Sequence, residues 1–299
     1  MGTMDDAALI ETIVRYKWYH RIRVRGDICT PSYLPSLPSF QDVWDLILAG
    51  MAMVDFRGKR VLDVGCRDGL FSFEAEHRGA EEVIGIDNDI SRGAVEFLIP
   101  FFNSRVRMYE MNLYDMTPDR FGLFDVIVFP GVLYHLRYPY WGLKQLLSCL
   151  SDNGILLIES GMLVEPGLEG HELLYCPVEN SPYEPTSCTF FNATALTTTL
   201  RAFRCRLLYS KMLSDMENRR TKPQYERLSG FFRQHRKSLK AAARKKFRML
   251  GNRGPLSVDR QLFLFEKSKG PGVSPWVKTY WDATHKIHTV GEDPRLGSS

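Results

Sequence analysis

The chain has 299 residues, of which 44% are hydrophobic and 25% are charged. This composition excludes a largely disordered protein and predicts one large domain or two smaller ones. No stretch of 18 apolar residues occurs, and the acidic start lacks the basic region of a signal peptide, so we expect neither a transmembrane helix nor a leader. The six cysteines are scattered without a Cys-x-x-Cys pair, which argues against a metal site and indicates reduced thiols in a cytoplasmic protein.

The region 1–56 is expected to form an extension of helices and loops that covers the functional site. Residues 7–24 have the pattern of a helix followed by a short strand, and the proline-rich stretch 31–39 interrupts regular structure. Residues 40–53 predict a second helix.

Short apolar, β-rich runs alternate with amphipathic stretches between residues 60 and 160. Strands are expected at 60–65, 82–87, 105–110, 124–129 and 154–160, and helices near 69–78, 91–102 and 139–150. This alternation is typical of βαβ units, so it predicts a doubly wound α/β fold with a parallel sheet. Ligands of such folds bind at the carboxyl ends of the strands.

Three further elements are expected after the fifth strand. Residues 192–203 predict a helix, and the runs 205–210 and 260–267 predict two strands that close the sheet as an antiparallel hairpin. The expected organisation is a main domain at 57–268 with an insertion at 211–259, followed by a polar tail at 269–299.

The insertion carries most of the positive charge. The net charge of the chain is +4, but the segment 219–248 holds twelve Lys and Arg residues against one acid, Glu226, so the rest of the chain is mildly acidic. Leucine and phenylalanine side chains are interleaved with these charges. Such a segment could bind nucleic acid, lie on an anionic membrane, or form a solvated helical insertion that caps the site. The sequence leaves these three alternatives open.

The first strand runs into a loop with glycine at positions 65 and 69. Gly65 and Gly69 let the backbone approach a ligand closely, whereas Arg67 breaks the G-x-G-x-x-G pattern that binds a dinucleotide pyrophosphate. Asp87 ends the next strand, where a carboxylate can bind both hydroxyls of a ribose. A nucleoside ligand without pyrophosphate remains, and S-adenosylmethionine (SAM) fits, with Asp63 available to balance its cationic amino-acid end.

Two more groups of candidate residues follow the third and fourth strands. Asn112 and Leu113 come after the third strand, where an amide side chain and a backbone N–H could bind an adenine edge. An asparagine after a strand is also a common turn former. Pro130 begins the stretch 130–135 after the fourth strand, where the sulfonium of SAM should lie.

At this point the sequence resembles the class I SAM-dependent methyltransferases over residues 57–210 and the final strand. The runs VLDVGCRDG, IGID and FDVIVFPGVLYH carry the resemblance, which implies a Rossmann-like, seven-stranded methyltransferase sheet. Within this superfamily, GVLYHLRYP and the arginine before the last strand resemble the tRNA wobble-uridine carboxymethyl-transferring methyltransferases. The resemblance implies cofactor contacts at Gly65, Asp87, Asn112, Leu113, Pro130 and Tyr134, with Arg260 near the active site. The upstream lysine contacts of that family are not matched by Arg21, Arg23 or Arg25, so SAM rather than carboxy-SAM is expected.

His135, Tyr134 and Arg260 are the candidate catalytic and substrate-binding residues. Methyl transfer to a hydroxyl usually needs a base, and a histidine beside the methyl group suits that role. Tyr134 could orient the sulfonium or the substrate, or it could pack as an ordinary aromatic residue. Arg260 could bind an anionic group as a rigid fork, or it could be a plain edge-strand arginine.

The sequence therefore predicts a SAM-dependent methyltransferase that methylates an oxygen of a small molecule or sugar. One alternative is a methyltransferase that modifies a tRNA uridine, which the basic segment favours. Another is a catalytically silent scaffold that binds SAM or a partner protein.

Overall fold

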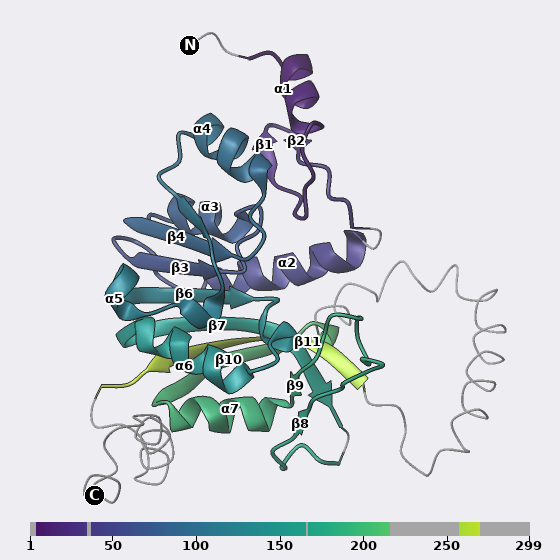
Figure 1. The fold of residues 1–299 in the computed structure, drawn as a ribbon, viewed down its shortest axis with the longest axis vertical. Helices are drawn as coiled ribbons and strands as arrows, with labels where there is room; N and C mark the ends of the chain where they lie inside the picture. Colours follow the sequence, from purple (N-terminus) through teal and green to yellow (C-terminus); the bar gives the residue numbers. More distant parts are fainter. Residues whose placement is uncertain (1–3, 35–36, 166, 216–256, 270–299) are drawn as a thin grey trace, which may run out of the picture.

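The computed structural model describes residues 4–34, 37–165, 167–215 and 257–269. Its centre is a seven-stranded sheet (Figure 1). The strands of this sheet are β3 (Arg60–Val64), β4 (Glu82–Asp87), β5 (Arg107–Glu110), β6 (Phe124–Pro130), β7 (Leu150–Val164), β10 (Cys205–Met212) and β11 (Ser257–Lys267). Their order across the sheet is β10-β11-β7-β6-β3-β4-β5.

The pairing of these strands confirms the predicted fold class. Strands β3 to β7 are parallel to one another, whereas β11 runs antiparallel to both β7 and β10. The predicted closing hairpin is therefore present at one edge of the sheet. The predicted insertion 211–259 overlaps both strands, since residues 211–212 belong to β10 and 257–259 belong to β11. Its basic segment 219–248 lies outside the described residues, as does the tail from 270 onward.

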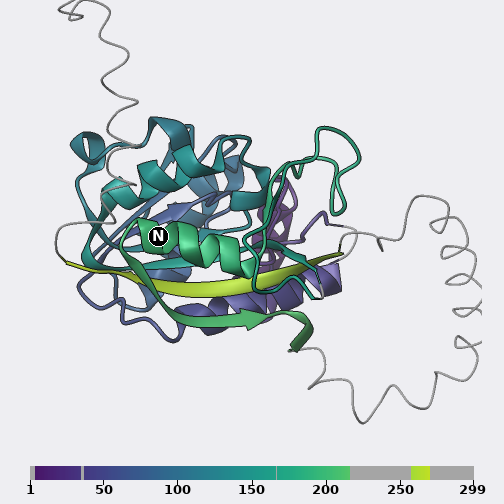
Figure 2. The same cartoon turned by 90° about the horizontal axis from the view of Figure 1, so that it is seen from below.

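Successive residues of each strand face opposite sides of the sheet, and each side is covered by helices. The helices are α1 (Asp6–Ile13), α2 (Leu37–Met51), α3 (Leu70–His77), α4 (Ile99–Phe102), α5 (Pro118–Phe121), α6 (Pro139–Cys149) and α7 (Ala193–Ala202). Leu62 packs in one core with side chains of α6 and α7, while its neighbour Val61 packs with side chains of α2 and α3. Figure 2 shows α7 and α2 on opposite sides of β11.

The N-terminal region packs against the chain that follows β4. Side chains of α1 and of the small hairpin β1 (Arg23–Arg25) and β2 (Ile28–Cys29) form a core with the π-helical turn Ala94–Leu98. The helical part of the predicted 7–24 segment ends at Ile13, whose carbonyl accepts a hydrogen bond from the indole of Trp18 at 2.8 Å. After Trp18 the chain runs toward the sheet, where Tyr19 and His20 contact the loop that follows β3.

Strand β7 is longer than predicted and is preceded directly by α6. Residues between the predicted helix 139–150 and the predicted strand 154–160 belong to the strand, and Asn153 adopts a left-handed conformation there (φ 60°). The strand continues to Val164 because β11 pairs with it from Ile155 onward, Ser257 lying opposite Val164. This extension positions residues of β7 and β11 at the carboxyl edge of the sheet.

Among the described residues, no helix combines the length and apolar character needed to cross a membrane.

Candidate functional site

A cavity of about 750 Å³ opens at the carboxyl ends of β3 to β6. Seven of the predicted site residues line it: Gly65, Asp87, Asn112, Leu113, Pro130, His135 and Arg260. The N-terminal extension supplies another part of its wall, including Tyr19, His20, Tyr33 and Trp44. Three predicted residues, Asp63, Gly69 and Tyr134, are outside the lining. His285 and His288, an H-x-x-H pair, lie outside the described residues.

The loop after β3 brings its backbone to the cavity. Gly65 has φ 79°, and a Cβ there would lie 2.3 Å from Cγ2 of Val132, so only glycine fits this close approach. The loop is tied to β4 by its backbone: the N–H of Arg67 donates to Asp87 Oδ2 at 2.9 Å. The second oxygen of Asp87 accepts from the N–H of Asp89 at 2.9 Å. Each oxygen retains a lone pair toward the cavity, as binding of ribose hydroxyls requires.

Burial raises the pKa of the Asp87 carboxyl, and the two backbone donors oppose this rise. A carboxylate that is partly desolvated gains more from additional hydrogen bonds than an exposed one does. Asp87 is thus a strong acceptor placed at the edge of the cavity.

Behind the Gly65 loop lie three buried polar atoms without a hydrogen-bond partner among the described residues: Oδ1 of Asp63, Oδ1 of Asp68 and Nδ1 of His20. Asp68 Oδ2 accepts from the backbone N–H groups of Tyr19 and His20 at 2.5 and 2.7 Å, which attaches the N-terminal extension to the loop. Asp63 is buried beneath the loop and accepts from Ser72 at 2.6 Å. Both aspartates are fully buried and lie outside the cavity lining, so they support the loop from behind rather than contact a ligand in the cavity.

Asn112 and Leu113 follow β5 at the far side of the cavity. Asn112 caps the short helix Leu113–Asp115, its side-chain oxygen accepting from the N–H of Tyr114 at 2.9 Å. The turn-forming role weighed from the sequence is therefore realised, and it leaves the amide N–H₂ group of Asn112 as a donor. This pair can hold a nucleobase edge only through that amide and the backbone.

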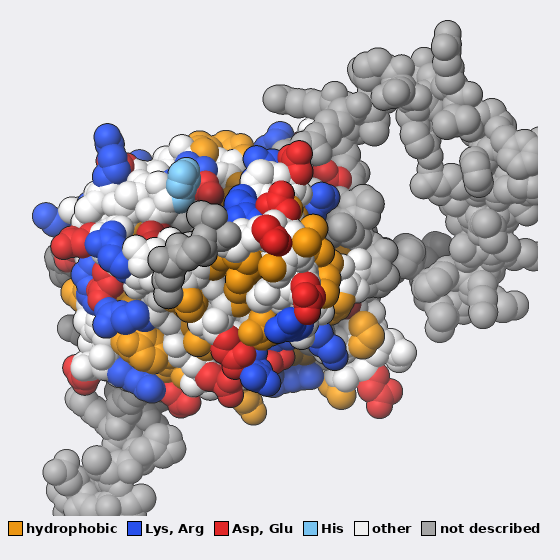
Figure 3. All heavy atoms as spheres, turned by 90° about the horizontal axis from the view of Figure 1, so that it is seen from above, with side chains coloured by type: hydrophobic (Ala, Val, Ile, Leu, Met, Phe, Trp, Pro, Cys, Tyr) orange, Lys and Arg blue, Asp and Glu red, His pale blue; other side chains and the backbone are white. Residues whose placement is uncertain are grey.

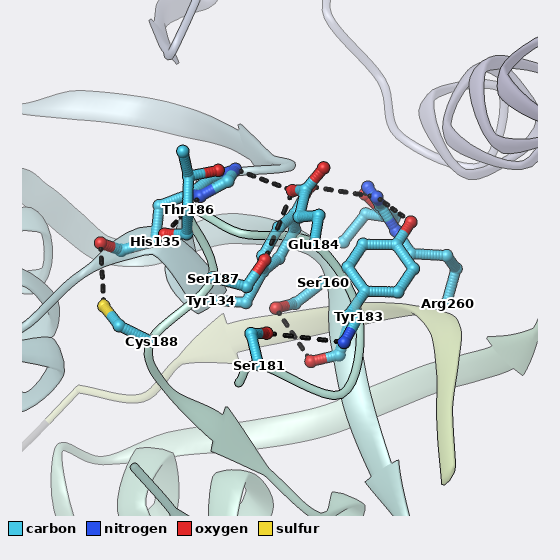
Figure 4. Close-up of polar contacts among 12 residues, drawn as sticks. Tyr134, His135, Ser160, Ser181, Tyr183, Glu184, Thr186, Ser187, Cys188 and Arg260 are labelled. Atoms are coloured by element: carbon cyan, nitrogen blue, oxygen red, sulfur yellow. Dashed lines mark hydrogen bonds and ion pairs between the residues drawn. The ribbon is translucent and has the colours of Figure 1, made fainter. Parts of the chain in front are cut away.

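Arg260 is buried in a network with Glu159, Tyr134 and Tyr183. Figure 4 shows Arg260 with the two tyrosines. Its Nε and Nη2 atoms donate to the two carboxylate oxygens of Glu159, each at 2.5 Å. Its Nη1 atom donates to the hydroxyls of Tyr134 and Tyr183 at 3.0 and 3.1 Å. The sequence analysis missed Glu159, although an acid inside the apolar run GILLIES is a signal that a buried charge needs a partner.

Antiparallel pairing explains this network. Arg260 lies opposite Gly161 on β7, two residues beyond Glu159, so the two side chains lie on the same face of the sheet. A bidentate pair of this kind fixes the orientation of both groups. The tyrosine hydroxyls therefore meet a guanidinium whose charge is already balanced.

His135 is held by a segment that follows β7 (Figure 4). Its Nδ1 atom lies 3.2 Å from the carbonyl oxygen of Thr186, and its Nε2 atom lies 3.2 Å from Oε1 of Glu184. The carbonyl of Tyr134 accepts from the N–H groups of Cys188 and Thr189. The His135 side chain remains about one third exposed, at 34%, so it lies at the mouth of the cavity rather than within the core.

Tyrosines from three separate parts of the chain lie around Arg260 and Glu184. Burial raises the pKa of Tyr19 to about 12, and Arg260, Glu184, Tyr33 and Tyr183 act on it electrostatically. Tyr19 and Tyr33 come from the N-terminal extension, which thus lines the same cavity as Arg260 of β11.

Within the described ranges, no group of three or more His, Cys, Asp or Glu side chains is arranged to hold a metal ion.

The buried Asp63 makes stability depend on pH. Burial raises its pKa to about 7, whereas in the unfolded chain the value returns to about 4. The folded chain therefore binds more protons in this interval, and its free energy of unfolding falls as pH rises from about 4 to 7.

Asp63→Asn is expected to remove this decline, which amounts to up to about 4 kcal/mol, while keeping an acceptor for Ser72. Urea unfolding at several pH values without cofactor measures it. The exposed Asp119→Asn serves as the control, and equal pH dependence in all three chains would contradict the assignment.

A model of the family described as "methyltransferase domain" matches residues 40–209. The chain belongs to this family. The assignment, together with the sheet order, confirms the predicted SAM-dependent methyltransferase class and its cofactor, SAM.

Curated relatives share part of this methyltransferase. A tRNA U34 carboxymethyltransferase of Campylobacter hominis is 33% identical over 143 residues, which are 46% of this chain and 50% of that protein. One from Pseudomonas paraeruginosa is 35% identical over 113 residues, which are 36% of this chain and 34% of that protein. The chain thus spans half or less of the length of these relatives.

Two solved structures share the fold of this methyltransferase. The N-terminal domain of EvdMO1, determined in the presence of SAH and D-fucose, is 14% identical with a TM-score of 0.54, covering 90% of this chain and all of that one. The [4+2]-cyclase SpnF is 16% identical with a TM-score of 0.50, covering 88% of this chain and 93% of that one. At these identities the likeness shows the fold alone, and a fold does not fix the reaction.

Proposed function

We propose that this methyltransferase transfers the methyl group of SAM to a hydroxyl of a small molecule or sugar. The observation that carries the proposal is the single cavity that joins the Gly65 loop and Asp87 to His135. Its volume of about 750 Å³ lies in the range of small-ligand sites. Such a site holds the cofactor together with a compact acceptor.

The residues fit the cofactor in the following way. The Gly65 loop would lie against its amino-acid end, Asp87 would bind the ribose hydroxyls, and Asn112 with Leu113 would contact the adenine. When bound, SAM supplies an electrophilic methyl group on a positively charged sulfur. Pro130 is proposed to flank the region where this methyl group meets the acceptor, while the buried Tyr134 would act from behind the cavity through its contact with Arg260.

His135 is proposed as the base. The Thr186 carbonyl can only accept a hydrogen bond, so Nδ1 keeps its proton and Nε2 is the nitrogen that can take another. The acceptor hydroxyl would take the place of the Glu184 carboxylate, which lies 3.2 Å from Nε2. As the acceptor oxygen is methylated, its proton would pass to Nε2.

The charges around the cavity support SAM over carboxy-SAM. Arg260 is paired with Glu159, and Arg67 forms an ion pair with Asp89. The cavity lining contains no lysine among the described residues. Of the three arginines in the lining, Arg67 and Arg260 are therefore already neutralised, and an additional carboxylate on the cofactor could pair only with Arg137.

A tRNA uridine is the second candidate acceptor. It is favoured by the names of the curated relatives and by the basic segment 219–248. Acidic and basic side chains are interspersed over the face in Figure 3, rather than gathered into a basic patch of the kind that binds phosphates. The volume of the larger cavity, which suits a compact acceptor, is our reason for ranking the small acceptor first.

A cytoplasmic location is part of the same proposal. All six cysteines are free thiols, and reduced thiols are typical of that compartment. Fractionation of the source cells would test it.

The proposal is tested by measuring release of S-adenosylhomocysteine from SAM by the purified full chain. The acceptors are a panel of methyl glycosides and phenols and, separately, bulk tRNA at two salt concentrations. Release with a glycoside or phenol and none with tRNA is expected. Turnover with tRNA alone, weakening steeply with salt, would replace the proposal by the second candidate. Calorimetric binding of SAM without turnover of any acceptor would favour the silent scaffold.

A further inference from the structure

A second cavity of about 280 Å³ lies beside the first. Its lining comes from the segment 177–188 and from His135 and Arg137. His135, Arg137 and Thr186 line both cavities. A ligand that leaves the larger cavity over these three residues therefore reaches the smaller one.

The smaller cavity offers polar groups that the protein itself leaves largely unused. Nη1 of Arg137 donates to the carbonyl of Pro177 at 3.3 Å, and no ion pair of this arginine is formed with the described residues. Asn180 and Glu179 are exposed side chains in the lining. Ser181 accepts from the N–H of Tyr183 at 3.3 Å, which leaves its hydroxyl proton to be donated.

The donors and acceptors in the smaller cavity favour an uncharged sugar over a phosphate as its ligand. A sugar hydroxyl both donates and accepts, so a ring that carries several hydroxyls can use a guanidinium, an amide, a carboxylate and a serine together. A phosphate would be attracted by Arg137, but it would meet the carboxylates of Glu179 in the lining and Glu184 nearby. Like charges at close range oppose its binding.

An exposed aromatic residue lies at the mouth on the side of the larger cavity. Tyr138 follows Arg137 directly, lines the larger cavity, and has 67% of its surface exposed. A tyrosine ring of this kind offers an apolar face with a polar edge. It can therefore cover the apolar face of a ring that passes between the cavities.

We propose that the smaller cavity is a subsite for a second sugar ring, so that the acceptor is at least a disaccharide-sized, uncharged polyhydroxylated molecule. The inference rests on the proposed function, because it assumes that a sugar hydroxyl is methylated in the larger cavity. The reacting ring lies next to His135, and the neighbouring ring contacts Arg137, Glu179 and Asn180.

The test compares kcat/KM for one-ring methyl glycosides, the matching two-ring methyl glycosides, and one-ring sugar phosphates, using the full chain and SAM. Two-ring acceptors are expected to be preferred over both other classes. Asn180→Gly removes the amide but keeps the backbone, since Asn180 has φ 56° and glycine adopts this conformation without strain. We expect it to lower the two-ring to one-ring ratio of kcat/KM about three- to tenfold, the loss of one or two hydrogen bonds.

Asn153→Gly is the matched control, because Asn153 is also exposed with a left-handed backbone (φ 60°) and lies in β7 outside both cavities. It is expected to leave the ratio unchanged. Equal kcat/KM for one-ring and two-ring acceptors, a preference for sugar phosphates, or an unchanged ratio in Asn180→Gly would overturn the subsite while leaving the proposed function in place. If no glycoside of either length is methylated, the subsite fails, and the proposed function fails as well if phenols are not methylated either.

Discussion

Replacing His135 by alanine is expected to lower kcat by about 10²- to 10⁴-fold, the usual contribution of a general base. The imidazole is the titratable group at the mouth of the cavity whose Nδ1 is fixed by the Thr186 carbonyl and whose Nε2 can take a proton. SAH release under saturating acceptor measures the effect, with SAM affinity followed separately by calorimetry. Unchanged SAM affinity would place the loss in the chemical step.

The control for this substitution is His77→Ala, at the exposed end of α3. A His135→Ala rate within twofold of wild type would remove His135 from the mechanism and leave positioning of the two reactants as the source of catalysis.

Replacing Asp87 by alanine is expected to weaken SAM binding by about 10²- to 10⁴-fold. The Asp87 carboxylate would accept two hydrogen bonds from the ribose hydroxyls. Each hydrogen bond to a charged group contributes about 1.5–3 kcal/mol to the binding free energy. It also holds the Gly65 loop through the N–H of Arg67. Calorimetric titration with SAM and with S-adenosylhomocysteine measures the loss for both forms of the cofactor.

Asp119→Ala, in the exposed turn of α5, is the matched control. Asp87→Asn keeps one acceptor oxygen, so we expect it to lie between wild type and alanine. Urea unfolding without cofactor shows whether the loop has lost its support. Retained SAM affinity in a stably folded Asp87→Ala chain would refute the placement of the ribose.

Much of the fold follows from local patterns in the sequence. The apolar run at 82–87 forms β4 with the predicted bounds. A strand that is buried on both faces is a continuous apolar run, so it can be predicted without knowing which strands pair with it. The glycine at 65 marks a left-handed turn that a side chain would obstruct. The Gly65 loop follows β3, and Asp87 ends the adjacent parallel strand β4. The loop backbone and the Asp87 carboxylate therefore lie at the same edge of the sheet.

Local patterns could not predict which distant side chains meet. Glu159 and Arg260 are 101 residues apart and come together only because β11 inserts antiparallel between β7 and β10. Likewise, Tyr19 and His20 reach the site because their backbone N–H groups bind Asp68, 48 or more residues away. Hydrogen bonds of this kind leave no periodicity in the sequence.

The surroundings of His135 show the same division. Its place after the fourth strand could be read from the sequence, and this identified it as a candidate base. Glu184 and Thr186, which fix the two ring nitrogens, belong to an irregular segment without repeating pattern. The sequence by itself determined the sheet, the cofactor loop and the class of reaction, since these depend on local hydrophobic and glycine patterns. Only the tertiary structure decided how charges are paired around the acceptor, because that pairing depends on contacts between segments far apart in the chain.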